Sequence, residues 1–347
     1  MLFCCKEPTM QIRDAIITVT NRTDLSQDDA AAVMEQMMNG EATPAQIAAL
    51  LTALHFKGET DAEIAGMAQV MRAKSLAVPH DGGVVDTCGT GGDHSNTFNI
   101  STTAAFVAAG AGATVAKHGN RAMSSKCGSA DVLEGLGVNI ELDAEGVARC
   151  LRQAGIGFMF APKFHPAMRY AGPVRREIGI RTIFNVLGPL TNPARAEYQV
   201  IGVANAGLAE KLANALSKMG IRRALVVHGS DGLDEISISA STLVFDVRAG
   251  ATPQASTISP SDFGLSLAPR EAIAGGSVEE NVAMTKAILE GSDTGPRRDI
   301  VLLNAAAALV ACERADSFGE ALRQAQQAID TGSANQRMQR MIEASNG

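Results

Sequence analysis

The segment VVDTCGTGGDHSNTFNIS, residues 84–101, decides the fold of this chain. Two valines lead into the glycine-rich run Gly89–Gly92, Asp93 closes the turn, and small residues from Ser101 to Gly110 have helical character. This order of strand, glycine loop and helix start is typical of phosphate-binding loops, because glycine lets an anion approach the backbone and the free N–H groups at the helix start point toward it. The loop lacks the Lys-Ser/Thr pair of a Walker A motif and the spacing of a dinucleotide fingerprint. Taken alone, it also fits a simple tight turn.

A second loop of this kind, KHGNRAMSSKCGS at residues 117–129, follows the predicted strand Thr114–Ala116. Its cations, hydroxyl groups and backbone amides are the groups that a polyphosphate requires. Ser129 is predicted to be the N-cap of the next helix. A solvated basic loop is the alternative interpretation. Two such loops after neighbouring strands favour phosphate binding.

The third motif is the acidic run DGLDE at residues 231–235, which follows the predicted strand Ala224–Val227. Adjacent carboxylates are often only surface charge, but beside a diphosphate they can bind Mg²⁺, which takes one or two carboxylates and keeps several waters. The hydroxyl of Ser101 can add a further ligand. In a predicted helix elsewhere, Arg175 and Arg176 point to different faces, so that one of them can bind a substrate carboxylate.

The periodicity of the chain divides it into a helical and an alternating part. Residues 10–75 read as helices, with Thr43-Pro44 and the Thr60-x-x-Glu63 box as helix starts. After Pro79 short strands alternate with helices, which predicts a largely parallel sheet. We therefore expect a helical domain of residues 1–79 joined by 162–193, and an α/β domain of residues 80–161 and 194–347. The predicted strands are Val84–Thr87, Thr114–Ala116, Val138–Ile140, Gly157–Ala161, Tyr198–Val203 and Ala224–Val227, with helices starting near Ser101, Ser129, Asp143 and Gly207.

Composition excludes some classes of function. The net charge of −7 over 347 residues argues against general nucleic-acid affinity, which requires a basic surface. The six cysteines form no C-x-x-C motif, the start MLFCCKEP does not resemble a signal peptide, and no run of about eighteen apolar residues occurs. We expect reduced thiols and a cytoplasmic protein.

Seven motifs in order resemble the anthranilate phosphoribosyltransferase family over nearly the whole chain: GTGGD, NIST (99–102), KHGNR, SADVLEGLG (129–137), HPAM (165–168), TIFNVLGPLTNP (182–193) and DGLDE. His94 and Cys127 are small departures from the family pattern. The resemblance implies a small all-helical domain and a larger α/β domain with a mostly parallel sheet, of the nucleoside phosphorylase and phosphoribosyltransferase type. It also implies an active site between the domains and a homodimer formed through the helical domains.

The activity implied is transfer of the phosphoribosyl group of 5-phosphoribosyl 1-diphosphate to anthranilate, in tryptophan biosynthesis. The resemblance assigns Gly89, Asn120 and Arg175 to anthranilate, and Ser101, Asp234 and Glu235 to Mg²⁺, with two ions per subunit. The positions implied for the phosphoribosyl donor are Gly89, Gly92, Asp93, Thr97, Asn99, Ile100, Ser101, Thr102, Lys117, His118, Gly119, Asn120, Arg121, Ala122, Met123, Ser124, Ser125 and Ser129.

No catalytic acid, base or nucleophile is expected, because the attacking aromatic amine is already neutral at pH 7. His118 is either an anchor of its loop or a substrate contact. A pyrimidine nucleoside phosphorylase shares the architecture but does not need a DGLDE-type metal pair. A non-catalytic nucleic-acid-binding homologue should be basic and lack part of the motif set, which is complete here.

Overall fold

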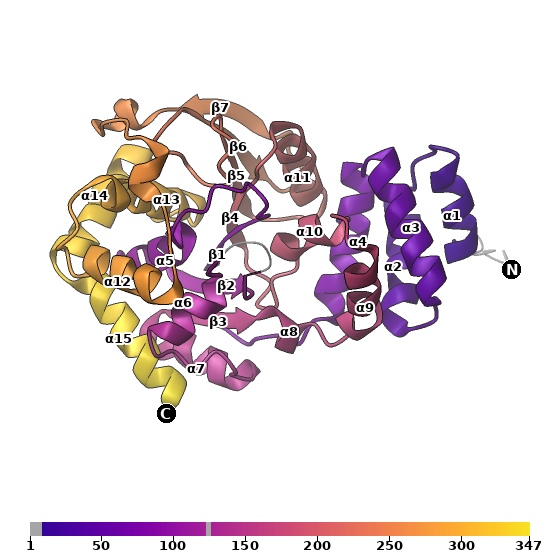
Figure 1. The fold of residues 1–347 in the computed structure, drawn as a ribbon, viewed down its shortest axis with the longest axis horizontal. Coiled ribbons are helices and arrows are strands. Elements are labelled where there is room, and N and C mark those ends of the chain that lie inside the picture. Colours follow the sequence, from indigo (N-terminus) through magenta and orange to yellow (C-terminus); the bar gives the residue numbers. More distant parts are fainter. Residues whose placement is uncertain (1–8, 123–125) are drawn as a thin grey trace, which may run out of the picture. The chain divides into compact units, whose positions relative to one another are not determined.

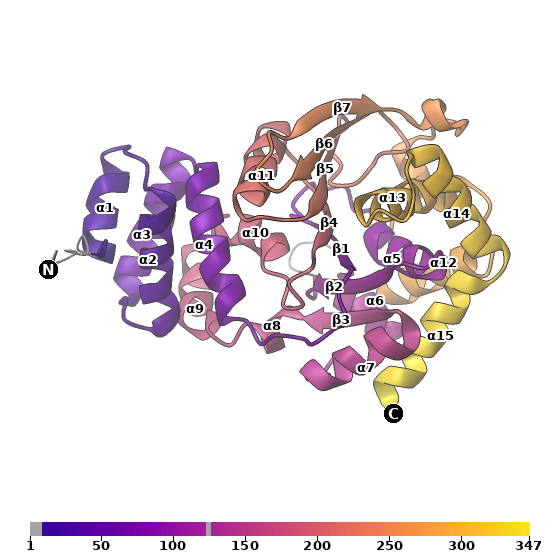
Figure 2. The same ribbon diagram turned by 180° about the vertical axis from the view of Figure 1, so that it is seen from behind.

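The computed structural model describes residues 9–122 and 126–347 and divides into two compact units. The helical unit comprises the chain up to Ser75 together with His165–Thr191. The α/β unit comprises Leu76–Phe164 and Asn192–Gly347. Figures 1 and 2 show the elements of each unit from opposite sides. None of the described helices is long and apolar enough to cross a membrane.

The helical unit brings together segments that lie far apart in the sequence. Helix α2 packs against α4, and α9 of the later segment packs against α2 and α3. Gly66 allows the close approach of α4 to α2, because a Cβ atom there would lie 2.1 Å from the carbonyl oxygen of Gln27. The helices of this unit are α1 (Ile12–Thr20), α2 (Gln27–Asn39), α3 (Pro44–Lys57), α4 (Asp61–Lys74), α9 (Met168–Ile178) and α10 (Phe184–Leu187), followed by a 3-10 turn at Gly188–Leu190.

The predicted helix starts of this unit are confirmed. The Thr43 hydroxyl accepts a hydrogen bond from the Gln46 amide, and the Gln46 side chain accepts one from the Thr43 amide. Thr60 and Glu63 form the same reciprocal pair. These side chains satisfy backbone N–H groups that a helix start leaves without partners.

The α/β unit is built on a seven-stranded sheet with the order β3-β2-β1-β4-β5-β6-β7. The strands from β3 to β5 are parallel, and β6 and β7 are antiparallel additions. The order reverses at β1, whose neighbours are β2 and β4, and ligands of open α/β sheets bind beyond the strand ends at such a reversal. The strands are β1 (Val84–Gly89), β2 (Thr114–Gly119), β3 (Ile156–Phe160), β4 (Tyr198–Gly202), β5 (Arg223–Gly229), β6 (Thr242–Arg248) and β7 (Gln254–Ile258).

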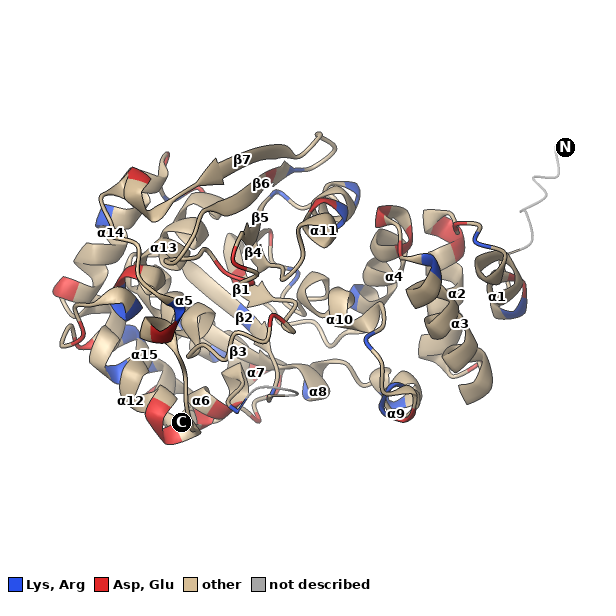
Figure 3. Ribbon diagram, turned by 45° about the horizontal axis from the view of Figure 1, so that its top comes forward, with Lys and Arg blue, Asp and Glu red and all other residues tan. Residues whose placement is uncertain are grey.

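Helices cover the sheet, and the most buried of them are rich in alanine. Helices α5 and α13 pack together and against β1, and small side chains let them approach closely. Charged residues are frequent on helices such as α11, α12 and α14 (Figure 3), whereas strands β3, β4 and β7 carry none. The helices are α5 (Ile100–Gly110), α6 (Ser129–Gly135), α7 (Ala144–Ala154), α8 (Ala161–Phe164), α11 (Ala206–Lys218), α12 (Val278–Leu289), α13 (Pro296–Ala311), α14 (Phe318–Asp330) and α15 (Ser333–Asn346), with 3-10 turns at Pro260–Phe263 and Arg270–Ile273.

One predicted strand, Val138–Ile140, is wrong. Val138 and Ile140 are buried, as the alternation of apolar residues suggested, but the segment joins no ladder of the sheet. Its backbone bonds elsewhere: the Asn139 amide donates to the hydroxyl of Ser345 in α15, at 3.0 Å. Alternating burial therefore arises here from packing against helices. The other predicted strands are present, with bounds within two residues except for Thr114–Ala116, which continues to Gly119, and the predicted helix starts near Ser101, Ser129, Asp143 and Gly207 are present within a residue.

Substitution of Gly66 should test the packing of the helical unit. Because a Cβ atom would meet the Gln27 carbonyl oxygen at 2.1 Å, Gly66→Ala should force α2 and α4 apart and destabilise the unit by about 1–3 kcal/mol. Gly319→Ala in α14 is the matched control, since its Cβ would meet nothing within 4 Å. Urea unfolding followed by circular dichroism should show a lower midpoint for Gly66→Ala alone. Equal midpoints for the two variants would contradict this packing.

Candidate active site

Three loops predicted from the sequence follow strands whose carboxyl ends lie at one edge of the sheet. Residues 90–99 follow β1, residues 120–128 follow β2, and residues 230–235 follow β5. Because β1, β2 and β5 are parallel members of one sheet, these loops share the edge at which α/β proteins bind ligands.

The GTGGD loop and the DGLDE loop are in direct contact. The backbone N–H of Gly91 donates to Oδ2 of Asp234, at 2.8 Å. A Cβ atom at Gly89 would lie 2.4 Å from that same carboxylate oxygen, and one at Gly202 would lie 1.5 Å from the carbonyl oxygen of Asp234. The acidic loop therefore crosses the ends of β1 and β4 at a distance that only glycine permits. Gly91 and Gly92 also have positive φ angles, of 63° and 78°.

The carboxylates of Asp93, Asp234 and Glu235 influence one another at this junction. Burial and the charge of Asp93 together raise the pKa of Asp234 to about 7, against the opposing effect of the hydrogen bond from the Gly91 amide. Burial and the charge of Asp234 raise the pKa of Glu235 to about 8, against the influence of Lys117. Oδ2 of Asp93 is buried and accepts no hydrogen bond from the described residues. Clustered, partly desolvated carboxylates of this kind favour a bound cation or proton.

Lys117 connects the second strand to the first loop. Its side chain is buried, and Nζ donates to the carbonyl oxygen of Thr87 in β1 and to Oγ of Ser101, the latter at 3.4 Å. Ser101 lies in the first turn of α5, and its backbone N–H donates to the Glu235 carboxyl group, which opposes the rise in the pKa of Glu235. The cation, the hydroxyl and the helix start thus lie beside the acidic loop.

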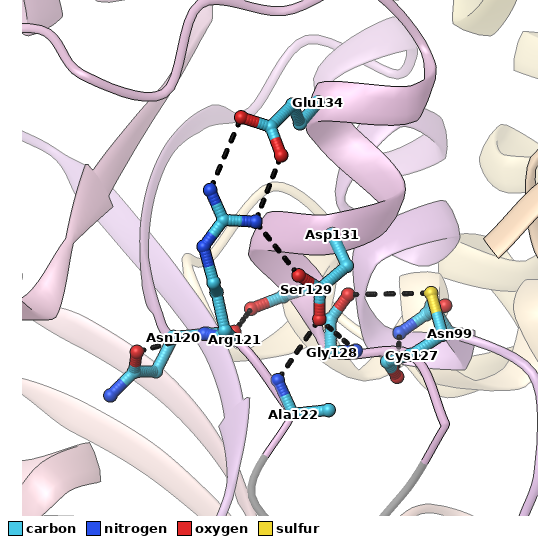
Figure 4. Close-up of polar contacts among 9 residues, drawn as sticks. All are labelled: Asn99, Asn120, Arg121, Ala122, Cys127, Gly128, Ser129, Asp131 and Glu134. Atoms are coloured by element: carbon cyan, nitrogen blue, oxygen red, sulfur yellow. Dashed lines mark hydrogen bonds and ion pairs between the residues drawn. The ribbon is translucent and has the colours of Figure 1, made fainter.

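The loop after β2 is closed by Asp131, a residue that the sequence analysis missed. Oδ2 of Asp131 accepts hydrogen bonds from the amides of Ala122 and Gly128, at 3.0 and 2.9 Å, so it joins both ends of the loop (Figure 4). The guanidinium group of Arg121 contacts Asp131 at 2.9 Å and Glu134 at 2.8 Å, and is therefore engaged by α6.

The predicted N-cap at Ser129 is wrong. Helix α6 has its N-cap at Gly128, and Ser129 is the first helical residue. The Ser129 hydroxyl donates to the carbonyl oxygen of Asn120, at 3.2 Å, and Asp131 accepts from the amide of the N-cap residue Gly128, at 2.9 Å. The side chain of Asn99 donates to the Cys127 carbonyl oxygen, at 3.2 Å, and so ties the start of α5 to this loop (Figure 4).

The remaining residues predicted to bind the phosphoribosyl donor differ in their burial and in their contacts. Ile100 and Thr102 are 1% exposed, and the Ile100 amide donates to the carbonyl oxygen of Phe98, at 2.8 Å. Thr97 forms an isolated bridge with Ala274, and Asn120 is exposed. Gly119 approaches Ser129 so closely that a Cβ atom would lie 2.3 Å from its hydroxyl oxygen. The predictions for Met123, Ser124 and Ser125 lie outside the described residues.

The histidine of the second loop is buried, and its backbone N–H donates to Oδ1 of Asp86, at 3.1 Å. Asp86 and its partner Asn192 were also missed from the sequence. A carboxylate within the apolar strand Val84–Thr87 was the available signal for Asp86, whereas Asn192 carried none.

Arg175 lies in α9 of the helical unit. Its guanidinium carbon lies 5.1 Å from the ring centre of Phe184, and burial lowers its pKa. No carboxylate forms an ion pair with it among the described residues. A half-buried guanidinium without an internal counter-ion suits an anionic ligand.

The acidic loop fits a cation that is held only partly by protein. Within the described residues, no three His, Cys, Asp or Glu side chains are arranged to enclose a metal. Two adjacent carboxylates and a hydroxyl beside phosphate-type loops instead match Mg²⁺, which takes few protein ligands and completes its shell with phosphate oxygens and water.

The fold and this site define a two-domain glycosyl transferase. Models of a glycosyl transferase family match the chain in both parts, the helical bundle domain over residues 13–75 and the a/b domain over residues 81–335. An anthranilate phosphoribosyltransferase of Chloroflexus aggregans is 69% identical over 338 residues, which cover 97% of this chain and 99% of that protein. The chain belongs to the anthranilate phosphoribosyltransferases of this family.

Solved structures of anthranilate phosphoribosyltransferases have the same fold as this chain. Anthranilate phosphoribosyltransferase from Thermus thermophilus matches with a TM-score of 0.91 and 41% identity, covering 96% of this chain and 100% of that one. The Saccharomyces cerevisiae enzyme in complex with PRPP and Mg matches with a TM-score of 0.85 and 27% identity, covering 95% and 98%. The same enzyme in complex with 4-fluoroanthranilate has a TM-score of 0.83 and 26% identity, covering 95% and 98%.

The raised pKa values predict how stability depends on pH in the absence of divalent cations. A carboxyl group whose pKa is higher in the folded than in the unfolded chain stabilises the fold fully below the unfolded pKa; this stabilisation declines as the pH rises above that value and is lost completely once the pH has passed the folded pKa. With pKa values of about 7 for Asp234 and about 8 for Glu235, the melting temperature in EDTA should fall between pH 6.5 and 8.5.

Asp234→Asn combined with Glu235→Gln should flatten this fall, measured by circular dichroism. The window lies above the range in which His165 titrates, because burial lowers its pKa to about 4. A wild-type melting temperature that stays level or rises across the window would contradict the carboxylate cluster.

Proposed function

We propose that this chain transfers the phosphoribosyl group of 5-phosphoribosyl 1-diphosphate to anthranilate, giving N-(5-phosphoribosyl)anthranilate and diphosphate, a step of tryptophan biosynthesis. The observation that supports this proposal most directly is the hydrogen bond from the Gly91 amide to the Asp234 carboxylate, which joins a glycine-rich loop of the phosphate-binding type to an acidic loop. It occurs in a chain that is 69% identical to a protein named for this activity.

The donor is held through its phosphates in this proposal. Backbone amides of the GTGGD loop and of the first turn of α5 are proposed to face the diphosphate, with Lys117 as the buried cation. The loop after β2 supplies further amides and side chains. The residues proposed for the donor are Gly89, Gly92, Asp93, Thr97, Asn99, Ile100, Ser101, Thr102, Lys117, His118, Gly119, Asn120, Arg121, Ala122, Met123, Ser124, Ser125 and Ser129.

Asp234, Glu235 and Ser101 would hold Mg²⁺, with two ions per subunit. When bound, Mg²⁺ neutralises negative charge on the diphosphate as it leaves. A cation at this position would favour the ionised forms of Asp234 and Glu235, which burial and the neighbouring carboxylates disfavour.

The chain's own residues assist bond cleavage by electrostatics and positioning. Loss of diphosphate from C1 of the ribose places negative charge on the leaving group, and Lys117 and the loop amides are the groups proposed to stabilise that charge. The anthranilate amine attacks C1 as the neutral group, so no side chain needs to remove a proton before the attack. Positioning the anthranilate amine next to C1 of the ribose provides the rest of the rate acceleration, and no covalent enzyme intermediate is formed.

Anthranilate is proposed to contact Gly89, Asn120 and Arg175. The fork of a guanidinium group can bind both oxygens of the anthranilate carboxylate. Stacking on Phe184 holds the Arg175 side chain in one orientation, which reduces the ordering cost of binding.

We also propose a cytoplasmic homodimer formed through the helical unit. A cavity of about 630 Å³ between α1 and α3 is lined partly by Phe56, whose side chain is 80% exposed, and Ile17 of α1 is 53% exposed. Exposed apolar side chains of this size are typical of protein–protein contacts.

The proposed activity can be followed by anthranilate fluorescence. Emission should fall only when the protein, Mg²⁺ and 5-phosphoribosyl 1-diphosphate are present together. The Asp234→Ala, Glu235→Ala double variant should need far more Mg²⁺ for the same rate, because it lacks both proposed carboxylate ligands. An unchanged Mg²⁺ titration would remove these residues from the metal site. Phosphorolysis of thymidine or uridine by the wild type, without consumption of anthranilate, would replace the proposal with a nucleoside phosphorylase.

Arg175→Ala should raise the KM for anthranilate far more than the KM for the phosphoribosyl donor. Loss of a charge-assisted pair costs about 1.5–3 kcal/mol, or about tenfold to a hundredfold in binding. Arg176→Ala is the matched control, since Arg176 is the exposed neighbour on the same helix and should leave both values close to the wild type. Equal increases in the two KM values of Arg175→Ala would contradict the assignment.

A further inference from the structure

The two strands that lead into the phosphate-type loops pair with each other over only a short stretch. Strands β1 and β2 are registered at Val84 with Thr114 and at Val85 with Val115, and at no later pair of these fully described strands. On its other side β1 stays paired with β4 as far as Gly89, and β2 stays paired with β3 as far as Gly119. The sheet therefore opens between β1 and β2 toward the edge that carries the candidate site.

Side chains replace the missing backbone ladder in this opening. Oδ1 of Asp86 accepts from the His118 amide, at 3.1 Å. Nδ2 of Asn192 donates to the Ala116 carbonyl oxygen, at 2.8 Å, and to Oδ2 of Asp86, at 2.7 Å. Lys117 Nζ donates to the Thr87 carbonyl oxygen. Backbone groups on both facing strands are thus satisfied without strand pairing, as buried backbone groups must be.

These side chains are completely enclosed. Asp86 and Asn192 are 0% exposed, and Lys117 is 3% exposed. A buried carboxylate is costly unless donors and a positive charge compensate it, and Asp86 has both: burial raises its pKa, while Lys117, Asn192 and the amides of His118 and Thr87 lower it. Oδ1 of Asn192 accepts from the Ala194 amide, at 2.9 Å, so the chain entering β4 is fixed to the same group.

We propose that Asp86 and Asn192 are positioning residues, which hold β1 and β2 apart and so set the spacing between the GTGGD loop and the KHGNR loop. This inference rests on the proposed function, because the spacing matters if both loops bind one diphosphate. Neither residue contacts the substrate. Asn192 lies 106 residues after Asp86 in the sequence and occupies the opening between β1 and β2. Its two donated hydrogen bonds, to Asp86 and to the Ala116 carbonyl oxygen, bridge these strands.

The test is the binding of diphosphate with Mg²⁺, measured by isothermal titration calorimetry on Asp86→Asn, Asn192→Ala and the double variant. Each single variant should bind diphosphate at least tenfold more weakly than the wild type. The double variant should be no more than about threefold weaker than either single variant, because both residues act through the same opening. The KM for 5-phosphoribosyl 1-diphosphate should rise in parallel.

Glu63→Gln is the matched control for a general loss of stability. Glu63 is also a completely buried carboxylate that accepts from a backbone amide, that of Leu25, and from a lysine, Lys57, but it lies in the helical unit. The Glu63→Gln substitution should lower the melting temperature of the protein and leave its affinity for diphosphate unchanged. All titrations are made at a temperature well below the melting midpoint of each variant. If Asp86→Asn does not fold, the diphosphate affinity of Asn192→Ala alone tests the proposal.

Wild-type diphosphate affinity in the folded variants would overturn the inference and leave the proposed function intact. The same loss of affinity in Glu63→Gln would also overturn it, since the effect would then be general destabilisation. Failure of the wild type itself to bind diphosphate or to consume anthranilate would instead contradict the proposed function, and the inference with it.

Discussion

The hydrogen bond from the Gly91 amide to the Asp234 carboxylate, 2.8 Å long, is the contact on which the candidate site depends. It places amides that attract anions next to carboxylates that attract cations. A magnesium diphosphate carries both signs of charge and complements both groups at once. The contact requires the absence of side chains at Gly89 and Gly202, because a Cβ atom at either position would overlap with Asp234. The glycines of this region are thus needed for close approach as well as for turn geometry.

The scaffold keeps this contact in place through a sheet edge and a close-packed aliphatic core. Strands β1 and β4 are paired in register up to Gly89 and Gly202 at their carboxyl ends, and Gly202 is paired in turn with Val227 of β5, so the loops start from fixed positions. Alanine-rich helices α5 and α13 pack beneath them. Only between β1 and β2 does the ladder stop early, and there buried polar side chains take its place. The paired strands and the fixed opening between β1 and β2 together define the shape of the sheet edge that carries the candidate site.

Much of this could be predicted from the sequence because the signals are local. Glycine loops after apolar runs, capping boxes and the change from helical to alternating periodicity depend on residues close together in the chain. The failures involve contacts that no local pattern encodes. Val138 and Ile140 alternate like a strand but join no ladder of the sheet, and the N-cap of α6 falls at Gly128, whose amide donates to Asp131, rather than at Ser129. Asp86 and Asn192 meet across 106 residues of sequence, so their partnership becomes visible only in the folded chain.

The most direct test of the central claim is a crystal structure of the protein with Mg²⁺ and diphosphate. The account predicts one diphosphate that accepts hydrogen bonds from amides of the GTGGD loop and from the loop after β2, with Mg²⁺ between it and the carboxylates of Asp234 and Glu235. A diphosphate bound to only one of these loops, or Mg²⁺ held away from Asp234 and Glu235, would contradict it.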